Sequence, residues 1–466
     1  MPHSFFIPLP GLFMVIQTPN GGVKMTDYKP MAHLPEASGY RAGDYLVLVG
    51  ELFGRGYANG LLEEARRIGM NVIGTTVGRR GSDGVLRPLN ADELAESEAV
   101  LGATVLNVPL EAGFDMETVD GQESFAEQLK SVRSDTWDQI SFTEALIESA
   151  RTCGALRFRN NLSQVVKELD MIIPAGSNIL FSHVMAGGFP RSRIFMLLLN
   201  RVFKGTGDKY LSSHLFWKSG IGRLCKASFN EVTAETFRYL LDETSGLRGR
   251  ITDSGGNVRY TAYGYHGTGV LVKGEYRWQS YIPYMPGWAK MRLEDIAEEA
   301  SSKGICATVF NCPEIQTNSS ALFLGVEISL YPLLAAIRRE VGEPVATILA
   351  ERCQAMLKEG QTVSHLLERA DSYLSSPILE QIIDFASWPQ HNTREQAELM
   401  LASSAELMGM HTDQKQLVCA ELSRIVFISI GRLMLHASWK PEAPVIWLNH
   451  DIIGRLLADA GGTGIV

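Results

Sequence analysis

A tyrosine and a lysine in the middle of the chain have side chains suited to proton transfer. Eight residues separate Tyr281 from Lys290. On one continuous helix the two would lie about 13 Å apart along the axis, at 1.5 Å per residue. Pro283 and Pro286 argue against such a helix, because proline has no amide proton and disfavours the α conformation in the residue before it. We therefore expect Tyr281 on an extended or turning segment and Lys290 in the first turns of the next helix, so that the chain can fold back and bring them together.

The chemistry of such a pair is acid catalysis. A free tyrosine has a pKa of about 10, and a nearby ammonium group favours its ionised form. The hydroxyl then becomes a better acid toward an oxygen that gains charge during a reaction. The alternative is a tyrosine in a packed loop and a lysine on a solvated face, since the chain has 14 tyrosines. Tyr284, six residues before Lys290, is a second candidate for the acid.

A glycine-rich turn near residue 50 predicts a cofactor site. The apolar run Tyr45–Val49 is typical of a strand buried on both faces of a parallel sheet. Gly50, Gly54 and Gly56 follow it and precede a helical pattern. Dinucleotide phosphates must approach the backbone amides at a helix N-terminus closely, and glycines leave that room. A purely structural turn is the alternative.

Two arginines follow the second predicted strand, residues 71–77. In Rossmann-type sheets an acidic residue at this place holds the ribose 2′-hydroxyl of NAD, whereas arginine accommodates the 2′-phosphate of NADP. Here Gly78 precedes Arg79 and Arg80. We therefore expect NADPH as the cofactor, with NADH as the second choice; two solvated arginines on a loop are the alternative interpretation.

Strand and helix patterns alternate along most of the chain. The further predicted strands are residues 103–110, a strand within 169–181, residues 258–263 and residues 305–310. This alternation predicts an α/β protein with a Rossmann-type, doubly wound parallel sheet and insertions. The expected domains are an irregular N-terminal arm at 1–43, an NAD(P)-binding Rossmann-like catalytic domain at 44–340, and a helical C-terminal region at 341–466 that acts as a cap or in dimerisation.

Several segments resemble those of one reductase family. AYGYHG at 262–267 and GWAK at 287–290 flank the tyrosine and lysine, QTNSSA occupies 316–321, and ILFSHVMA at 179–186 precedes Pro190. In type and order they are similar to segments of the trans-2-enoyl-CoA/enoyl-acyl carrier protein reductases, enlarged relatives of the short-chain dehydrogenases/reductases whose mark is a Tyr and a Lys eight residues apart. The resemblance covers about residues 44–340.

The resemblance implies an NAD(P)H-dependent reductase of the C=C bond of a trans-2-enoyl thioester, carried by coenzyme A or acyl carrier protein. It assigns Tyr281 to the enolate oxygen, Lys290 to the pKa of that tyrosine and to the nicotinamide ribose, and Tyr265 to the thioester carbonyl. The further expected cofactor contacts are the hydroxyl groups of Ser182, Thr317 and Ser319.

Two other functions fit the same pattern. Departures from the family pattern, such as the stretched turn Ala186–Arg191 and the indole of Trp288 beside Lys290, affect the choice of substrate more than cofactor use. A ketone reductase of the short-chain dehydrogenase type would keep the Tyr/Lys pair. A non-catalytic scaffold would bind the cofactor and turn nothing over.

Composition excludes several classes of protein. The 466 residues are 45% hydrophobic and carry a net charge of −9 without a basic run, which argues against nucleic acid or an anionic membrane as a partner. The six cysteines have neither metal-site nor disulfide spacing, so we expect no metal and a cytoplasmic location. No run approaches the roughly 20 apolar residues of a membrane span. A homodimer is compatible with these features.

Overall fold

A computed structural model describes residues 28–52, 56–119, 121–133, 135–195, 198, 213–280, 287, 289–317, 325–379 and 393–459. Within these residues, seven parallel strands form one sheet in the order β11-β10-β7-β6-β1-β2-β5. The strands are β1 (Tyr45–Val49), β2 (Asn71–Thr76), β5 (Thr104–Pro109), β6 (Ile179–His183), β7 (Val258–Gly264), β10 (Ala307–Asn311) and β11 (Val445–Trp447). This doubly wound order confirms the predicted fold class.

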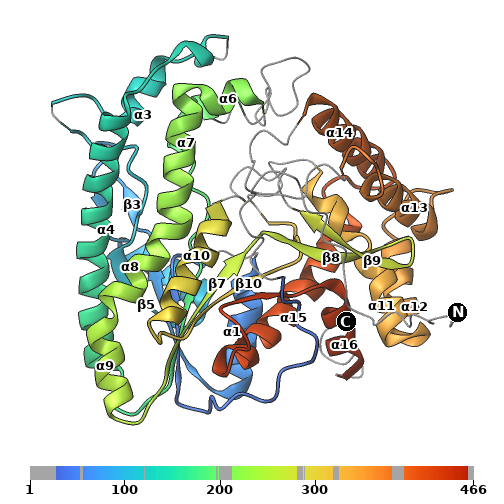
Figure 1. The fold of residues 1–466 in the computed structure, drawn as a ribbon, viewed down its shortest axis with the longest axis horizontal. Coiled ribbons are helices and arrows are strands. Elements are labelled where there is room, and N and C mark those ends of the chain that lie inside the picture. The colour runs from blue at the N-terminus through green and yellow to red at the C-terminus, as the bar shows by residue number, and fades with distance from the viewer. Residues whose placement is uncertain are drawn as a thin grey trace, which may run out of the picture.

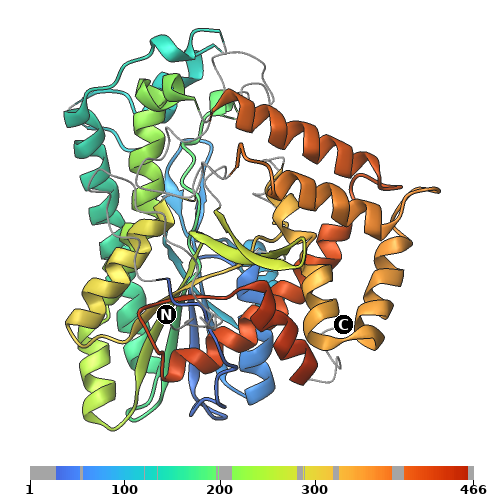
Figure 2. The same ribbon diagram turned by 45° about the vertical axis from the view of Figure 1, so that its right-hand side comes forward.

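Helices cover both faces of the sheet (Figures 1 and 2). The long helix α4 (Glu144–Ile172) lies on one face with α8 (Thr236–Glu243), α9 (Ser245–Asp253) and α10 (Ala289–Ser302). On the other face lie α1 (Tyr57–Ile68) and α15 (Val418–Trp439). The described residues form two hydrophobic clusters: one lies between the sheet and the α4 layer, and the larger one lies beside α1 and α15 and continues to α7 and the N-terminal part of α4.

The apolar run in β1 explains this three-layer arrangement. Successive side chains of a strand point to opposite faces of the sheet. Leu46 and Leu48 enter the core beside α1, whereas Val47 and Val49 enter the core beside α4. All four are at most 1% exposed. The strand therefore has to be apolar at every position rather than at alternate ones.

Helices α1 and α15 cross at two glycines. A Cβ on Gly60 would overlap the carbonyl oxygen of Phe427, and one on Gly431 would overlap the backbone of Gly60. The missing side chains therefore let the two backbones touch. Glu64 of α1, which is 3% exposed, accepts a hydrogen bond of 2.9 Å from Nε2 of His436 in α15. The C-terminal part of the chain thus supports the helix that follows the glycine-rich turn.

A β-hairpin separates β7 from α10. Its strands β8 (Gly267–Val272) and β9 (Glu275–Ser280) pair antiparallel through a two-residue turn. The turn residues Lys273 and Gly274 have φ angles of 49° and 82°, as the right-handed twist of such hairpins requires. Sequence patterning identified only the strand before this hairpin.

The remaining α-helices of the described residues complete the two layers and the C-terminal region. They are α2 (Ala91–Leu101), α3 (Phe125–Gln128), α6 (His214–Lys218), α7 (Gly220–Asn230), α11 (Leu333–Val341), α12 (Glu343–Gln354), α13 (Val363–Leu374), α14 (Arg394–Gly409) and α16 (His450–Asp459). A π-helical turn, Glu231–Glu235, joins α7 to α8, and a small hairpin consists of β3 (Arg79–Arg80) and β4 (Leu86–Arg87). In the described part of the chain, no helix is long and apolar enough to cross a membrane.

The segment beyond residue 340 contributes to the main sheet as well as to the helical region. β11 pairs with β10 at the edge of the sheet. The amide of Met31 in the N-terminal arm donates to the carbonyl of Trp447 in β11. The first 27 residues of the predicted arm lie outside the described residues. The division into an arm, a catalytic domain and a C-terminal region stays a prediction.

Candidate active site

The carboxyl ends of the strands meet at one edge of the sheet, where ligands of such folds bind. From β1 the chain proceeds to β2 and β5 on one side, and it returns through β6 to β7, β10 and β11 on the other. The order of the strands therefore reverses between β1 and β6. In open α/β sheets this switch point is the expected position of a dinucleotide.

The glycine-rich turn lies at this switch point. Gly50 has a φ angle of 120°, and a Cβ there would lie 2.9 Å from Cγ2 of Val184 in the segment after β6. Gly56 directly precedes α1, and a Cβ there would have no described atom within 4 Å apart from those of its chain neighbours. Among the described residues, no side-chain hydrogen bond caps this helix, and its first turn has no acidic residue. The positive end of the helix dipole at this N-terminus therefore suits an anionic group. Gly54 lies outside the described residues.

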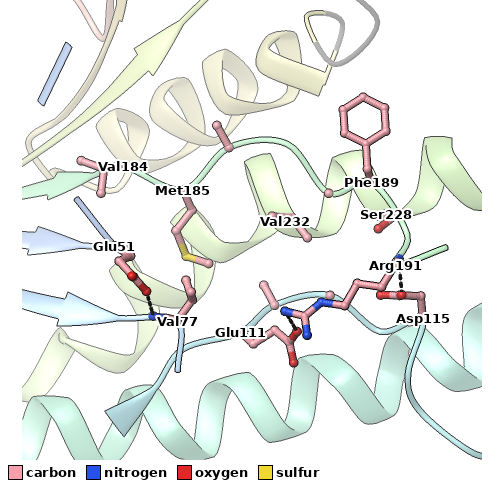
Figure 3. Close-up of a pocket in the computed structure, with 14 residues that line it drawn as sticks. Glu51, Val77, Glu111, Asp115, Val184, Met185, Phe189, Arg191, Ser228 and Val232 are labelled. Carbon is pink, nitrogen blue, oxygen red and sulfur yellow. Dashed lines mark hydrogen bonds and ion pairs between the residues drawn. The ribbon is translucent and has the colours of Figure 1, made fainter. Parts of the chain in front are cut away.

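A cavity of about 300 Å³ lies over the ends of β1, β2, β5 and β6. Its walls are Glu51 and Val77, the segment Glu111–Asp115, and the segment Val184–Arg191 with Ser228 and Val232 (Figure 3). Apolar side chains such as Met185 lie opposite the carboxylates of Glu51 and Glu111 in this view. The cavity thus combines an apolar wall with polar groups at fixed positions, as small-molecule sites do.

Both predicted phosphate-binding arginines are engaged by carboxylates. Arg79 binds Glu51 with two hydrogen bonds, of 2.9 Å from Nη1 and 2.8 Å from Nη2. Nε of Arg80 donates to Glu111 at 2.7 Å, and Arg191 forms an ion pair of 2.5 Å with the same carboxylate. The structure therefore places both arginines beside the cavity, each with a negatively charged partner.

Lys290 lies in the first turn of α10, as predicted. Its side chain is buried, and its ammonium lies 5.4 Å from the centre of the Tyr265 ring, within the range of a cation–π interaction. Burial lowers the pKa of Lys290 to about 7, although the nearby Cys312 slightly opposes this shift. The structure thus brings Lys290 and Tyr265 together. Tyr281 and Tyr284 lie outside the described residues, between the end of β9 at Ser280 and the start of α10.

Two tyrosines that the sequence reasoning missed, Tyr57 and Tyr263, lie close to the predicted Tyr265. The ring of Tyr57 stacks on Tyr263 at 5.6 Å and lies 5.5 Å from Tyr265. Its hydroxyl donates a hydrogen bond of 2.6 Å to the carbonyl of Pro313, after β10. Tyr57 is the first residue of α1, directly after the glycine-rich turn, and that position was the available signal. Tyr57 thus links the glycine-rich turn to the residues around Lys290.

The predicted hydroxyl residues occupy different positions. Ser182 is completely buried in β6 and does not line the cavity. Thr317 is half-buried at the end of a described segment, next to Gln316, whose amide donates to Ser423 of α15. Ser319 lies outside the described residues. The neighbouring His183 is neutral, because burial lowers its pKa to about 3, and Nε2 lies 2.7 Å from the Thr236 hydroxyl.

A buried polar network holds the start of α10 in place. Glu294, one turn after Lys290, contacts Nδ1 of His266 at 3.0 Å and accepts a hydrogen bond of 2.7 Å from the Asn311 amide. The amide of His266 donates to Oδ1 of Asn311 at 2.9 Å. A side chain on Gly264 would overlap that Asn311 oxygen. The network joins the end of β7, the end of β10 and the helix that carries Lys290.

Comparison with known proteins identifies the family. Residues 27–457 match the family described as "Enoyl-acyl carrier protein reductase FabMG". The chain belongs to this family. A structure titled "Apo structure of FabMG, novel types of Enoyl-acyl carrier protein reductase" is 44% identical, with a TM-score of 0.89; the match covers 94% of this chain and 100% of the other.

A second solved structure, titled "NADH bound structure of FabMG, novel type of Enoyl-acyl carrier protein reductase", is 37% identical with a TM-score of 0.74 over the same shares of the two chains. Among curated proteins, none matches the chain. Membership of the FabMG family confirms the predicted enzyme class, an NAD(P)H-dependent oxidoreductase of the enoyl reductase type. It also confirms the resemblance to enoyl-acyl carrier protein reductases.

Proposed function

We propose that this protein uses a reduced nicotinamide dinucleotide to reduce the C=C bond of a trans-2-enoyl thioester carried by acyl carrier protein. The main support is the contact between the buried Lys290 and Tyr265, which lies on one side of the switch point of the sheet. The glycine-rich turn lies at the switch point. Membership of the FabMG family supplies the substrate class, and a relative has been described with NADH bound.

The residues at the switch point fit such a cofactor. The turn containing Gly50, Gly54 and Gly56 would receive the pyrophosphate at the N-terminus of α1. The cavity over β1, β2, β5 and β6 would receive the adenosine. The nicotinamide would then lie toward β7, β10 and Lys290. Ser182, Thr317 and Ser319 are further proposed contacts, of which Ser182 would act from beneath the cofactor.

The chain's own residues would handle the proton and the developing charge. When bound, the cofactor would supply a hydride to the β-carbon, and the conjugated double bonds would shift so that negative charge develops on the thioester carbonyl oxygen. Tyr281 would hydrogen-bond to this oxygen and protonate it, and the resulting enol would become the saturated thioester when its hydroxyl proton is lost and the α-carbon gains a proton. Lys290 would lower the pKa of the tyrosine and bind the nicotinamide ribose, while Tyr265 would orient the carbonyl.

The protonation of Lys290 suits this role at neutral pH. With a pKa of about 7, the group exists as both ammonium and amine around neutrality. Only the ammonium stabilises a phenolate. An oxygen that becomes negative in the site would favour the ammonium, because opposite charges at short distance raise the pKa of a lysine. The charge needed for catalysis would therefore develop together with that of the substrate.

Two parts of the chain would have different roles. We propose that residues 44–340 carry the catalytic groups and that residues 341–466 cover the site and support α1. A cytoplasmic homodimer also stays a prediction, and light scattering of the purified protein would test its oligomeric state.

The decisive experiment is cofactor oxidation by the purified protein with trans-2-enoyl thioesters of acyl carrier protein and of coenzyme A, at several chain lengths, beside a panel of ketones. Turnover of an enoyl thioester that Lys290→Met abolishes would support the proposal. Lys303→Met is the matched control, because Lys303 is exposed just beyond the end of α10. Turnover of ketones alone, or cofactor binding without turnover of any enoyl thioester, would refute the proposed substrate.

A further inference from the structure

An acidic group occupies the place that Rossmann folds use to bind the adenosine ribose, but it comes from an unexpected strand. The carboxylate of Glu51 accepts hydrogen bonds from the Thr76 hydroxyl at 3.0 Å and from the Val77 amide at 3.3 Å. Both donors lie at the carboxyl end of β2, whereas Glu51 follows β1. The usual acid belongs to the end of the second strand itself.

The backbone explains why β2 does not supply the acid. The corresponding residue is Gly78, with a φ angle of 74°. A Cβ there would overlap Pro109 and lie 2.7 Å from the carbonyl oxygen of Arg87. A side chain therefore has no room at position 78, and Glu51 reaches the same place from the neighbouring turn.

The carboxylate of Glu51 is buried and charged. Its side chain is 6% exposed and lines the cavity shown in Figure 3. Burial alone would raise the pKa of Glu51. The positive charge of Arg79 and the hydrogen bonds donated by Arg79, Thr76 and Val77 outweigh burial and hold this pKa below its usual value. Glu51 is therefore an anionic acceptor at neutral pH.

The arginines around the cavity have carboxylate partners. Arg79 is bound by Glu51, and Arg80 and Arg191 by Glu111. Arg157, which also approaches Glu111, forms its closer ion pair with Glu117 at 2.8 Å. A 2′-phosphate, which carries a charge of about −1.5 to −2 at pH 7, would thus meet paired cations and the anionic Glu51.

We propose that Glu51 accepts the ribose 2′-hydroxyl of NADH and excludes the 2′-phosphate of NADPH, and that Arg79 holds the carboxylate in position. This inference rests on the proposed cofactor site and reverses the NADPH preference expected from Arg79. An ionised carboxylate accepts a strong hydrogen bond from a hydroxyl and repels a phosphate. Glu51 would therefore both strengthen the binding of NADH and weaken the binding of NADPH.

The test is the ratio of kcat/KM for NADH to that for NADPH, together with the Kd of each cofactor measured by nucleotide fluorescence. Glu51→Gln keeps the shape of the side chain but removes its charge and releases Arg79. We expect weaker NADH binding, tighter NADPH binding and a ratio lowered about 10- to 100-fold, the range for a hydrogen bond to a charged group. In the double variant Glu51→Gln/Arg79→Gln the loss for NADH should remain and the gain for NADPH should disappear.

Two comparisons separate selection from a structural role. Glu117→Gln also breaks a carboxylate–arginine pair, but it lies outside the cavity lining and should leave the ratio unchanged. Equal losses for both cofactors in Glu51→Gln, or a wild-type protein that prefers NADPH, would overturn the inference.

The fluorescence measurement also separates this inference from the proposed reaction. A Glu51-dependent preference for NADH without turnover of enoyl thioesters would support the role of Glu51 and refute the substrate. Turnover with a ratio that Glu51→Gln does not change would support the reaction and refute the role of Glu51.

Discussion

The Glu294 carboxylate contacts Nδ1 of His266 at 3.0 Å, one helical turn beyond Lys290. Glu294 is completely buried and His266 is 6% exposed. Because Asn311 donates to the same carboxylate, a single side chain ties α10 to two strand ends. The position of Lys290 in the site therefore depends on this buried carboxylate.

Replacing Glu294 should therefore reduce both stability and activity. Glu294→Gln should lower the free energy of unfolding by about 1–3 kcal/mol, because it weakens hydrogen bonds to a buried carboxylate. It should also lower kcat more than it raises KM for the cofactor, since the Lys290 helix loses its anchor. Urea unfolding and steady-state kinetics measure the two effects. Glu298→Gln, on the exposed side of the same helix, is the control, and equal behaviour of the two variants would refute the role of Glu294.

The identity of the acid can be decided by two conservative substitutions. Tyr281→Phe should lower kcat by about 10²- to 10⁴-fold, the usual contribution of general acid catalysis. Cofactor affinity should stay unchanged, because only the hydroxyl group is removed. Tyr284→Phe should keep most of the activity. The opposite pattern in single-turnover kinetics would assign the acid to Tyr284 and leave the rest of the site intact.

The lowered pKa of Lys290 predicts a specific pH dependence of stability. In the unfolded chain the lysine has a pKa of about 10.4, whereas in the folded, cofactor-free protein it is about 7. Between these values the unfolded chain holds a proton that the folded protein has released, so the contribution of Lys290 to stability rises with pH. From pH 7 to 9 the gain should be about 2 kcal/mol.

Urea unfolding at both pH values, compared between the wild type and Lys290→Met, isolates this effect from other titrating groups. The stability of the wild type should rise relative to that of Lys290→Met as the pH increases. Lys303→Met should follow the wild type. If the stability of the wild type and that of Lys290→Met changed with pH in parallel, Lys290 would remain charged in the folded protein, and its pKa would not be lowered.

The glycine crossing of α1 and α15 predicts a severe effect from one methyl group. Gly431→Ala would place a Cβ on the backbone of Gly60, so the helices must separate. We expect a loss of stability of about 1–3 kcal/mol or more, together with weaker cofactor binding because the N-terminus of α1 shifts. Gly409→Ala, in α14 with open space around it, should be neutral or slightly stabilising. Thermal unfolding and cofactor titration of both variants would test this, and a fully stable Gly431→Ala would contradict the packing.

Local patterns were sufficient to predict the frame of the site. The strand Tyr45–Val49 and the helix ending before Gly69 appear as predicted, because burial on both faces and helical periodicity leave local signals. Lys290 lies in the first turn of a helix for the same reason. The fold class follows from the order of these units.

The contacts that complete the site could not be predicted in this way. Glu51 reaches the end of a different strand, and whether Arg79 faces a phosphate or a carboxylate depends on that contact. The hairpin before α10 and the pairing of Glu294 with His266 depend on tertiary packing. No periodicity within a single segment encodes such partners.

The contact between α1 and α15 also affects the order in which the protein can fold during its synthesis. Glu64 and His436 are 372 residues apart in the chain. At 5–20 residues per second, the ribosome needs roughly 20 to 75 s to make the second helix after the first. During that time the apolar side of α1, including Leu61 and Ala65, lacks its final partner. The N-terminal part of the nascent chain would therefore reach its native packing late, and we expect chaperones to bind it until α15 has been synthesised.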